Sequence, residues 1–390
     1  MGKISFTQEQ IKEILAEIAK QKDGFETLLK LSLEALMKSE REEFKNQYND
    51  SSNGFRKRMI LGAGSTQLIL DVPRTRKHNF YPVILAILND REAEARELAF
   101  KLYSAGLTTE QVAEIYEHLY GKYYSKSQIS RMFQTARETV WQWLERPLEE
   151  YYPIVYVDAI FLPVRRVDSV SREAFYTVLG VRADRRREVL ALVNFPTESA
   201  TGWKELFSRI KQRGVKRIDL VVSDALKGIE DAIASEFSSA NIQFCTTHLK
   251  RNVLNRVKSK DKDMIALELK EVFKTDDPQD SPQKGWQRWK EFIQKHSAKY
   301  KVLERMLEPR YYYYFTYLKY DYRIRSMIYT TNWIERLNRD YRRVTRMRGA
   351  MPSVESAITL LGAVAMNKTA FERKIPRLNY DKSFDWICDY

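Results

Sequence analysis

The chain has 390 residues, more than the roughly 250–300 at which a single hydrophobic core stops growing, so two or more domains are expected. Hydrophobic residues make up 44% and charged residues 30%, and only 14 Gly and 11 Pro are present, which excludes a collagen-like or largely disordered chain. No apolar run approaches the ~20 residues that a membrane span needs. The two cysteines exclude a disulfide scaffold and suit a reducing compartment. We therefore expect a globular cytoplasmic protein without a membrane partner.

Charge gives the first positive indication of a partner. The chain carries 66 Lys and Arg against 52 Asp and Glu, a net charge of +14. The excess is uneven, because residues 251–390 hold 29 basic and 18 acidic side chains whereas residues 1–50 hold 8 and 10. A basic C-terminal third suggests a polyanion such as nucleic acid. A merely solvated basic surface is the alternative.

The first hundred residues predict helices followed by a β-hairpin. Apolar residues recur at helical spacing through residues 7–48, with a capping-box pattern at Thr7 and a second helix after Gly24. Two short strand-like runs, 56–61 and 66–72, then surround a glycine-containing turn, which is typical of a hairpin. Basic residues flank both runs.

The next segment has the pattern of a helix-turn-helix. A helix ending at Gly106 is followed by a short helix capped at Thr108, a break at Gly121, and a longer helix from Ser125 to about Leu144. Side chains at the start of the second helix commonly contact bases. Here they are Lys126, Ser127, Gln128, Ser130 and Arg131. An ordinary helical pair is the alternative.

From residue 151 the hydrophobic period changes to that of strands alternating with helices. The predicted strands are 154–161, 174–181, 188–195, 217–223 and 242–244, and the predicted helices are 203–214, 226–237 and 247–258. The first three strands have connections too short for crossover helices, so they predict an antiparallel meander. The order β-β-β-α-β-α-β-α is that of the ribonuclease H-like fold, a mixed sheet with helices. Residues 259–328 then read as mainly helical, and a final helical stretch runs from about Thr331 to Thr369.

Two carboxylates stand at positions where metal chemistry is plausible. Asp158 lies within the first strand among apolar neighbours, and Asp224 ends the fourth strand. These strands are adjacent in the predicted order, so both acids could reach one divalent cation. An ionised carboxylate among apolar residues is costly unless it is paired or metal-bound. Glu335, on the late helix, is the candidate third acid. For either aspartate alone, a satisfied acid at a strand end is the alternative.

Such a trio suits phosphoryl transfer by two Mg²⁺ or Mn²⁺ ions. Mg²⁺ prefers oxygen ligands and keeps open positions for phosphate. In a two-metal site one ion activates the attacking water or 3′-hydroxyl, and the other stabilises the leaving oxygen. No nucleophilic side chain is then needed.

Several blocks of the sequence resemble the Mutator-type transposases of bacterial insertion sequences, over nearly the whole chain. They are NGFRKRM, LILDVPRTR, GLTTEQVAEIYEHLYGKYYSKSQISR, YVDAIFLPVR, GVRADRRREVLALV, ESATGWKELFSRIKQRGV, VVSDALKGI, CTTHLKRNVL and TTNWIERLNRDYRRVTRMRG, the last being the most specific. The resemblance implies that Asp158, Asp224 and Glu335 form an Asp-Asp-Glu catalytic triad. The 110 residues between Asp224 and Glu335 would then hold the helical insertion of the family.

Two departures from the family pattern touch no metal ligand. Ala225 stands where the family often has Gly, and a small residue is kept. After Ala159 come Ile160 and Phe161, where the family more usually places an aromatic after a polar or β-branched residue. We expect catalytic activity to survive both.

Two further groups bear on the site. Cys245 and His248 form a C-x-x-H pair that the family also has; structural zinc needs about four ligands, so we interpret His248 as supporting Asp224 or contacting DNA. A cluster of arginines follows Glu335 on the same predicted helix, and guanidinium suits phosphate bidentately, although a solvated face is the alternative. The arginines are Arg336, Arg339, Arg342, Arg343, Arg346 and Arg348. The aromatic run 311–315, with Tyr317, Tyr320 and Tyr322, is interpreted as packing, with base stacking the alternative.

Together these features predict an α+β multidomain protein in five regions. They are an N-terminal helical region (1–50), a basic hairpin and helix-turn-helix DNA-binding region (51–150), a ribonuclease H-like core (151–258), a helical insertion (259–328), and a catalytic helix with a basic tail (329–390). The resemblance implies a metal-dependent transposase that binds the terminal inverted repeats of its element and target DNA as double strands. It would act as at least a homodimer, in the bacterial cytoplasm at the nucleoid.

Two alternatives remain. One is a catalytically idle, transposase-derived DNA-binding regulator. The other is a ribonuclease H-like nuclease that takes no part in transposition.

Overall fold

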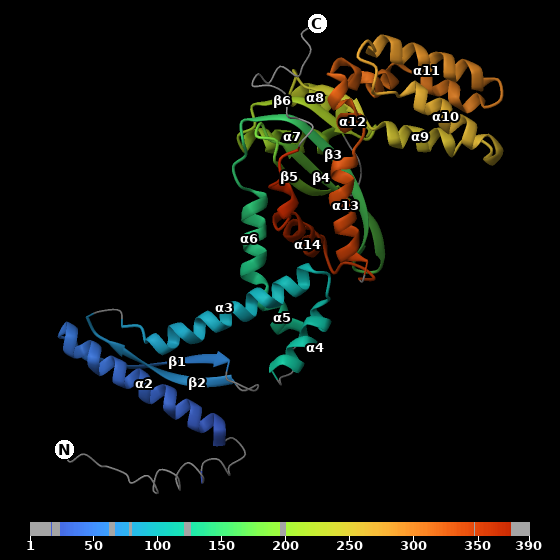
Figure 1. Ribbon diagram of the computed structural model, residues 1–390. Helices are drawn as coiled ribbons and strands as arrows, with labels where there is room; N and C mark the ends of the chain where they lie inside the picture. Colours follow the sequence, from blue (N-terminus) through green and yellow to red (C-terminus); the bar gives the residue numbers. More distant parts are fainter. Residues whose placement is uncertain are drawn as a thin grey trace, which may run out of the picture. The chain divides into compact units, whose positions relative to one another are not determined.

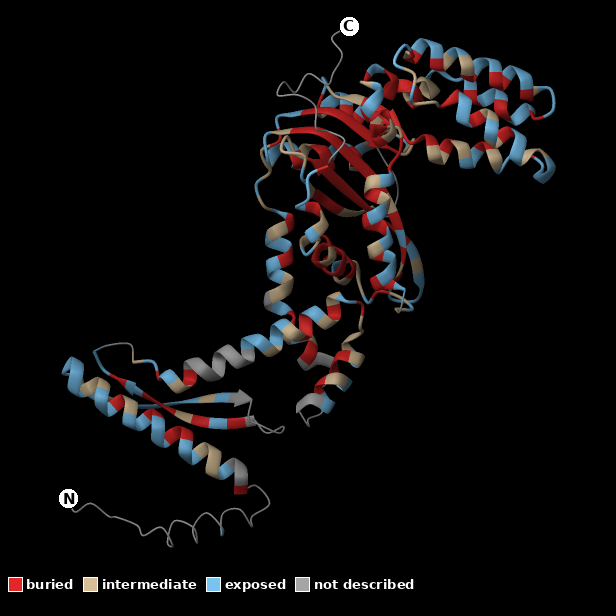
Figure 2. Ribbon diagram, in the orientation of Figure 1, coloured by how far each residue is buried: buried red, intermediate tan, exposed pale blue. Residues whose placement is uncertain are grey.

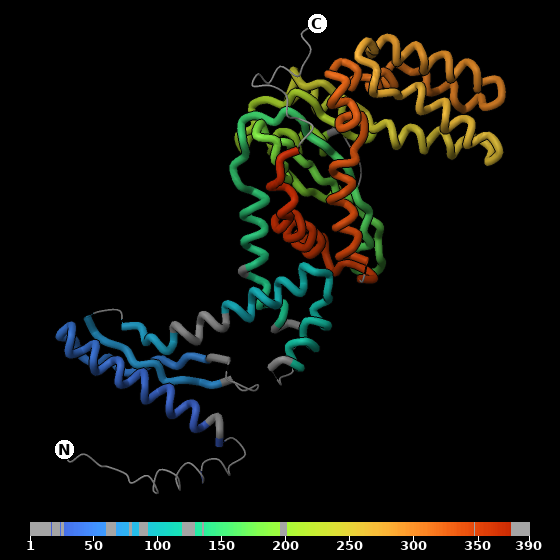
Figure 3. Tube along the Cα trace, viewed as in Figure 1, coloured from blue at the N-terminus to red at the C-terminus, as the bar shows by residue number. Residues whose placement is uncertain are grey.

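The chain separates into two compact units, Met1–Ala136 and Arg137–Tyr390 (Figures 1 and 3). The computed structural model describes residues 17, 24–61, 67–77, 80–120, 126–195, 200–346 and 348–375. The capping box predicted at Thr7, the hairpin turn, and the segment from Gly121 to Ser125 lie outside these residues.

In the first unit, a long helix packs on the predicted hairpin. Helix α2 (Gly24–Tyr48) packs on strand β2 (Gln67–Thr75), which pairs antiparallel with β1 (Ser52–Leu61). The hairpin is confirmed, with longer strands than its apolar runs indicated. Its core is formed by buried apolar side chains from both elements and the helix that follows. They are Leu33, Met37, Leu68, Leu70, Val72 and Leu85.

The predicted helix-turn-helix region is helical, but its second helix is shorter than expected. Helix α3 (Val83–Ser104) ends before Gly106, whose φ is +116°, and α4 (Thr109–Tyr120) has the predicted capping box, with Thr108 and Gln111 bonding each other's backbone N–H at 2.9 and 3.2 Å. The prediction of one helix to Leu144 is wrong, because the chain forms α5 (Lys126–Met132) and α6 (Gln134–Leu144) with a break at Phe133.

The break at Phe133 has a packing cause. The Phe133 side chain is fully buried, with its ring centroid 4.8 Å from that of Tyr103 and 6.3 Å from that of Phe100. A turn at this residue lets the ring enter the core between the helices. Burial of an aromatic ring is worth more than one helical hydrogen bond.

The second unit is built on one five-stranded mixed sheet. Its strands are β3 (Tyr151–Arg165), β4 (Val170–Val181), β5 (Arg187–Phe195), β6 (Arg217–Ser223) and β7 (Asn241–Phe244). The spatial order is β5-β4-β3-β6-β7, with β3, β4 and β5 antiparallel and β6 and β7 parallel to β3. The predicted meander and the adjacency of the first and fourth strands are both confirmed. Figure 2 shows that these strands are largely buried.

Helices pack around this sheet and continue the chain. They are α7 (Ala200–Gln212), α8 (Ile229–Glu236), α13 (Asn332–Thr345) and α14 (Val354–Met366), with α13 against β3 and α14 against β5. The prediction of one helical stretch from Thr331 to Thr369 is wrong. Gly349 and Pro352 interrupt it, and Met351 instead pairs with β3, its N–H bonding the Pro163 carbonyl at 2.8 Å.

Between β7 and α13 the chain is mainly helical, as predicted. The elements are α9 (Thr246–Leu254), η2 (Ser259–Asp261), α10 (Lys262–Val272), α11 (Pro282–Ser297), η3 (Lys301–Leu307), η4 (Pro309–Lys319) and α12 (Tyr322–Ile328). Of the aromatic run, Tyr314, Phe315, Tyr317 and Tyr320 are buried, which confirms packing for these four. Tyr311, Tyr312 and Tyr313 are half-buried and Tyr322 is exposed. Within the described residues, no helix has both the length and the apolar character of a membrane span.

Candidate active site

Three elements of the second unit bring the three predicted acids together. Asp158 lies within β3, directly after Val157, which pairs with Ser223 of β6. Asp224 follows Ser223, so both aspartates lie at the same point of two adjacent strands. Glu335 lies in the first turn of α13, which packs on β3. The Asp224 and Glu335 carboxylates both lie near enough to raise the pKa of Asp158.

Asp158 is the buried member of the group. Its exposed fraction is 7%. Burial, more than the two neighbouring carboxylates, raises its pKa to about 7, and the Ala159 N–H, which donates to Oδ1 at 2.9 Å, offsets part of this rise. The other oxygen, Oδ2, accepts a 2.7 Å hydrogen bond from the side-chain amide of Asn338. Two further carboxylates beside this buried one concentrate negative charge that a cation would relieve.

Asp224 has a basic partner in His248. Nδ1 of His248 contacts Oδ1 of Asp224, and the histidine follows β7 on the first turns of α9. Hydrogen bonding to Asp224, and next to Cys245, raises the pKa of His248 to about 11, so the imidazole is charged at neutral pH. Single ligand atoms of Asp224, Cys245 and His248 all lie within 4.8 Å of one another. The predicted C-x-x-H pair therefore adjoins the carboxylates.

The helices α9 and α13 both begin at this site. Cys245 is the N-cap of α9 and Thr331 is the N-cap of α13, and the Thr331 hydroxyl lies 3.3 Å from Cys245 Sγ. The same hydroxyl lies 3.3 Å from Oε1 of Glu335. The Thr246 N–H and hydroxyl both donate to the Tyr329 carbonyl at 3.0 Å, which holds the two helix starts together.

Comparison with known proteins identifies the family. The family model described as "Transposase, Mutator family" matches residues 3–373. The chain belongs to the Mutator family of transposases. It is 30% identical over 357 residues to the transposase for insertion sequence element IS905 of Lactococcus lactis, covering 88% of this chain and 89% of that protein. It is 32% identical to the ISRM3 transposase of Rhizobium meliloti, over 83% of this chain and 80% of the relative.

Two further likenesses extend over most of the chain. The transposase for IS256 in transposon Tn4001 of Staphylococcus aureus is 29% identical over 94% of this chain and 96% of that protein. A solved structure, the Drosophila P element transposase strand transfer complex, aligns with a TM-score of 0.35 at 9% identity, over 76% of this chain and 94% of that one.

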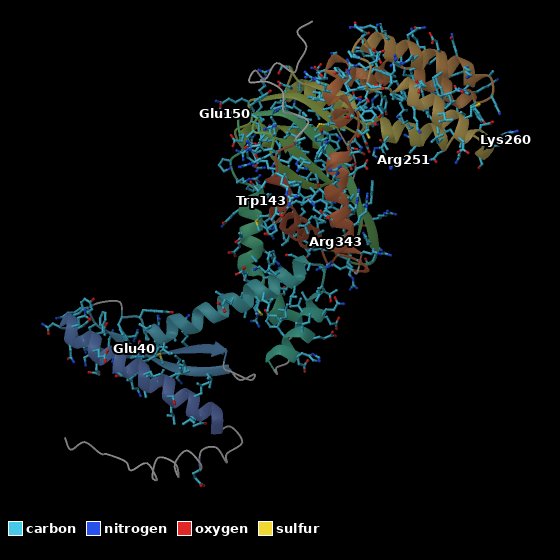
Figure 4. All side chains as sticks on the ribbon, viewed as in Figure 1. Glu40, Trp143, Glu150, Arg251, Lys260 and Arg343 are labelled. Carbon is cyan, nitrogen blue, oxygen red and sulfur yellow. The ribbon has the colours of Figure 1, made fainter. Side chains whose placement is uncertain are left out.

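The arginines that were predicted to bind DNA follow Glu335 on α13 of this Mutator-family chain, with Arg346 as the C-cap residue of the helix. Arg336, Arg339, Arg342, Arg343 and Arg346 are all exposed, and none forms a salt bridge with any residue that the structure describes. Arg339, Arg342 and Arg346 follow Glu335 at intervals of one, two and three helical turns, on the same side of the helix. Figure 4 labels Arg343 on this helix. Arg336 differs from the others, because its guanidinium lies 4.8 Å from the Trp333 ring centroid.

The helix-turn-helix candidates lie in the first unit. Lys126, Ser127 and Gln128 begin α5, and their side chains lie outside the described part of the chain. Ser130 is half-buried and Arg131 is exposed on the same helix. Ile129, fully buried beside them, fixes which side of α5 faces the core.

Sequence reasoning missed Asn338. Its exposed fraction is 0%, and it lies one turn beyond Glu335 among the buried residues Ile334, Leu337 and Tyr341. The signal was present, because an amide in the apolar face of an amphipathic helix needs a hydrogen-bonding partner. The sequence did not reveal that this partner is Asp158.

Proposed function

We propose that this chain is the DNA transposase of a bacterial insertion sequence, binding the terminal inverted repeats of its element and cutting and rejoining DNA strands. The observation that carries the proposal is the meeting of three carboxylates from separate elements, with Asp224 and Glu335 beside the buried Asp158. Membership of the Mutator family supports it. The strand order β5-β4-β3-β6-β7 supports a ribonuclease H-like core around these acids.

The three acids fit a divalent metal. They offer only oxygen atoms, the donors that Mg²⁺ and Mn²⁺ prefer, and burial together with the two neighbouring carboxylates disfavours the ionised form of Asp158 without a cation. When bound, two such ions would activate the attacking hydroxyl and stabilise the leaving oxygen of an in-line phosphoryl transfer. The three carboxylates are the proposed ligands and catalytic residues.

The neighbouring side chains have positioning roles in this proposal. Asn338 holds Oδ2 of Asp158, and the Thr331 hydroxyl lies beside Glu335, so both carboxylates are oriented from the same helix. His248 contacts Asp224 and offsets its charge. The group of Asp224, Cys245 and His248 has three potential ligands where structural zinc needs about four. We therefore assign Cys245 and His248 a supporting role instead of a zinc site.

DNA binding is divided between the two units. The exposed arginines of α13 would hold phosphates of the DNA at the cleavage point, because guanidinium matches phosphate oxygens bidentately. The hairpin and helix-turn-helix region, residues 51–150, would read the terminal repeat through the start of α5. Joining two element ends requires two sites, so we propose a homodimer or larger assembly on DNA.

The decisive experiment is a strand-transfer assay with labelled element ends, chosen as the inverted repeats that flank the gene. A transposase yields metal-dependent cleavage and joined products from these ends. An idle regulator would bind the ends without cutting them. A ribonuclease H-like nuclease outside transposition would cut without end specificity and yield no joined product.

A further inference from the structure

The segment that leaves the active site through α9 is basic and lacks acids. Residues 246–260 contain five Lys and Arg, one His and no Asp or Glu. The five are Lys250, Arg251, Arg256, Lys258 and Lys260. Like charges this close along the chain repel one another, and a polyanion that lies against them relieves this repulsion.

These cations differ from the others of the helical insertion. None of the five forms a salt bridge within the described residues, whereas several neighbours beyond residue 261 do. The paired neighbours are Lys274, Arg288, Lys295 and Lys299, each with a carboxylate within 3.0 Å. Arg251, Arg256, Lys258 and Lys260 are exposed, so their charged groups are accessible to a partner.

Lys250 is the half-buried member of the set. Its ammonium lies 5.3 Å from the ring centroid of Phe273 and 5.6 Å from that of Tyr329. With no carboxylate in ion-pair contact among the described residues, it adds positive charge beside the site.

Helix α9 connects the basic segment 246–260 to the carboxylates of the candidate active site. His248 contacts Asp224, and Arg251 lies one helical turn beyond His248. Since the N-caps of α9 and α13 touch, two basic helices begin at the same carboxylates. In Figure 1 the two helices leave the site in different directions, and Figure 4 labels Arg251 and Lys260 along the α9 arm and Arg343 along the α13 arm.

We propose that α9 and the segment to Lys260 form a second track for the DNA backbone. Duplex DNA on one side of the cleaved phosphate would lie along α13, and duplex on the other side along α9. This inference rests on the proposed function. Helix α9 has 9 residues, about 13 Å at 1.5 Å per residue, which corresponds to roughly four base pairs at 3.4 Å each. A phosphate contact carries no sequence preference.

The test is a salt titration of DNA binding by the full-length protein carrying Arg251→Ala and Lys260→Ala. The probe is a duplex with one element end and about 20 base pairs on either side of the cleavage point. We expect weaker binding to specific and scrambled DNA alike, with a log–log salt slope lower by about two. The matched control carries Lys284→Ala and Lys290→Ala on α11, separated from α9 by α10 (Figure 1), and should keep the wild-type slope.

Shortening the DNA locates the track. When the duplex on one side ends within one or two base pairs of the cleavage point, wild type and the Arg251→Ala/Lys260→Ala variant should bind equally. Shortening the other side should leave their difference intact. A slope equal to that of the control, or a loss confined to the specific sequence, would overturn the second track.

Failure of the underlying function is distinguishable from failure of this inference. If the proposed function is wrong, the wild-type protein makes no metal-dependent joined product from element ends. If only the α9 track is wrong, the wild-type protein is active and the α9 variant behaves like the α11 control. Equal thermal unfolding midpoints of the two variants show that neither result reflects misfolding.

Discussion

The side-chain amide of Asn338 donates a 2.7 Å hydrogen bond to Oδ2 of Asp158. Because Asn338 lies one turn after Glu335 on α13, this bond ties the helix that carries the third acid to the strand that carries the first. It fixes the orientation of Asp158 and the register of α13 on β3 at once. Asn338 is therefore a positioning residue for the proposed metal site.

Replacing Asn338 with Ala should weaken metal binding without abolishing DNA binding. A hydrogen bond to a charged group contributes about 1.5–3 kcal/mol, so the Mg²⁺ concentration for half-maximal cleavage should rise roughly ten-fold or more. Mn²⁺ binding, followed by electron paramagnetic resonance without DNA, should weaken in parallel. The control is Thr345→Val, which removes another buried hydrogen bond of α13, to the Tyr341 carbonyl. A metal dependence equal to that of this control would contradict the positioning role.

The raised pKa of Asp158 predicts how the metal-free protein responds to pH. Burial raises this pKa to about 7, so between about pH 4 and 7 the folded protein holds a proton that the unfolded chain releases. Stability therefore falls as pH rises through this window. Asp158→Asn removes that fall, and in EDTA at pH 8 the variant should be more stable by on the order of 1–3 kcal/mol. Denaturant unfolding at pH 5 and 8 measures it; equal pH dependence in both proteins would refute the assignment.

The arginines of α13 should hold the DNA backbone without reading sequence. Arg339→Ala with Arg343→Ala should weaken binding to specific and scrambled duplexes alike and lower the log–log salt slope by about two. Strand-transfer yield should fall as well. Fluorescence anisotropy across a range of salt concentrations gives the slopes, with Lys284→Ala/Lys290→Ala as the control. If only the specific duplex loses affinity, this helix reads bases.

Arg131 should behave in the opposite way. It is exposed on α5, whose neighbouring Ile129 is fixed in the core. Arg131→Ala should reduce affinity for the terminal repeat by about 1–3 kcal/mol, the value of one good base contact, and leave binding to scrambled DNA nearly unchanged. Competition binding with both duplexes measures the ratio. An equal loss of affinity for the terminal repeat and for scrambled DNA would show that Arg131 contacts phosphates instead of bases.

The sheet and the meeting of the acids followed from local pattern. Alternating apolar residues and short connections allow few strand topologies, and these place Asp158 and Asp224 on adjacent strands. The ends of the helices were harder to predict from the sequence. The break at Phe133 depends on the space that Phe100 and Tyr103 leave for its ring, which no local propensity encodes.

Contacts between side chains that lie far apart in the chain were also difficult to predict from the sequence. Asn338 and Asp158 are separated by 180 residues, and only the packing of α13 on β3 selects one as the partner of the other. The contact between His248 and Asp224 was one of two roles expected for the C-x-x-H pair, and the start of α9 beside β6 selects it. By contrast, the end of α13 had a local signal in Gly349 and Pro352, which the continuous apolar period concealed.

The proposed activity requires that Asp158, Asp224 and Glu335 act together as metal ligands for strand transfer. The direct measurement is strand-transfer yield from labelled element ends in Mg²⁺ and Mn²⁺, for wild type and for Asp158→Asn, Asp224→Asn and Glu335→Gln, with end binding measured in parallel. We expect each substitution to abolish cleavage and joining in both metals while end binding persists, because each removes one anionic ligand and keeps the shape of the side chain. Substantial strand transfer by any one of the three variants would contradict the assignment of that residue and, with it, the three-carboxylate site.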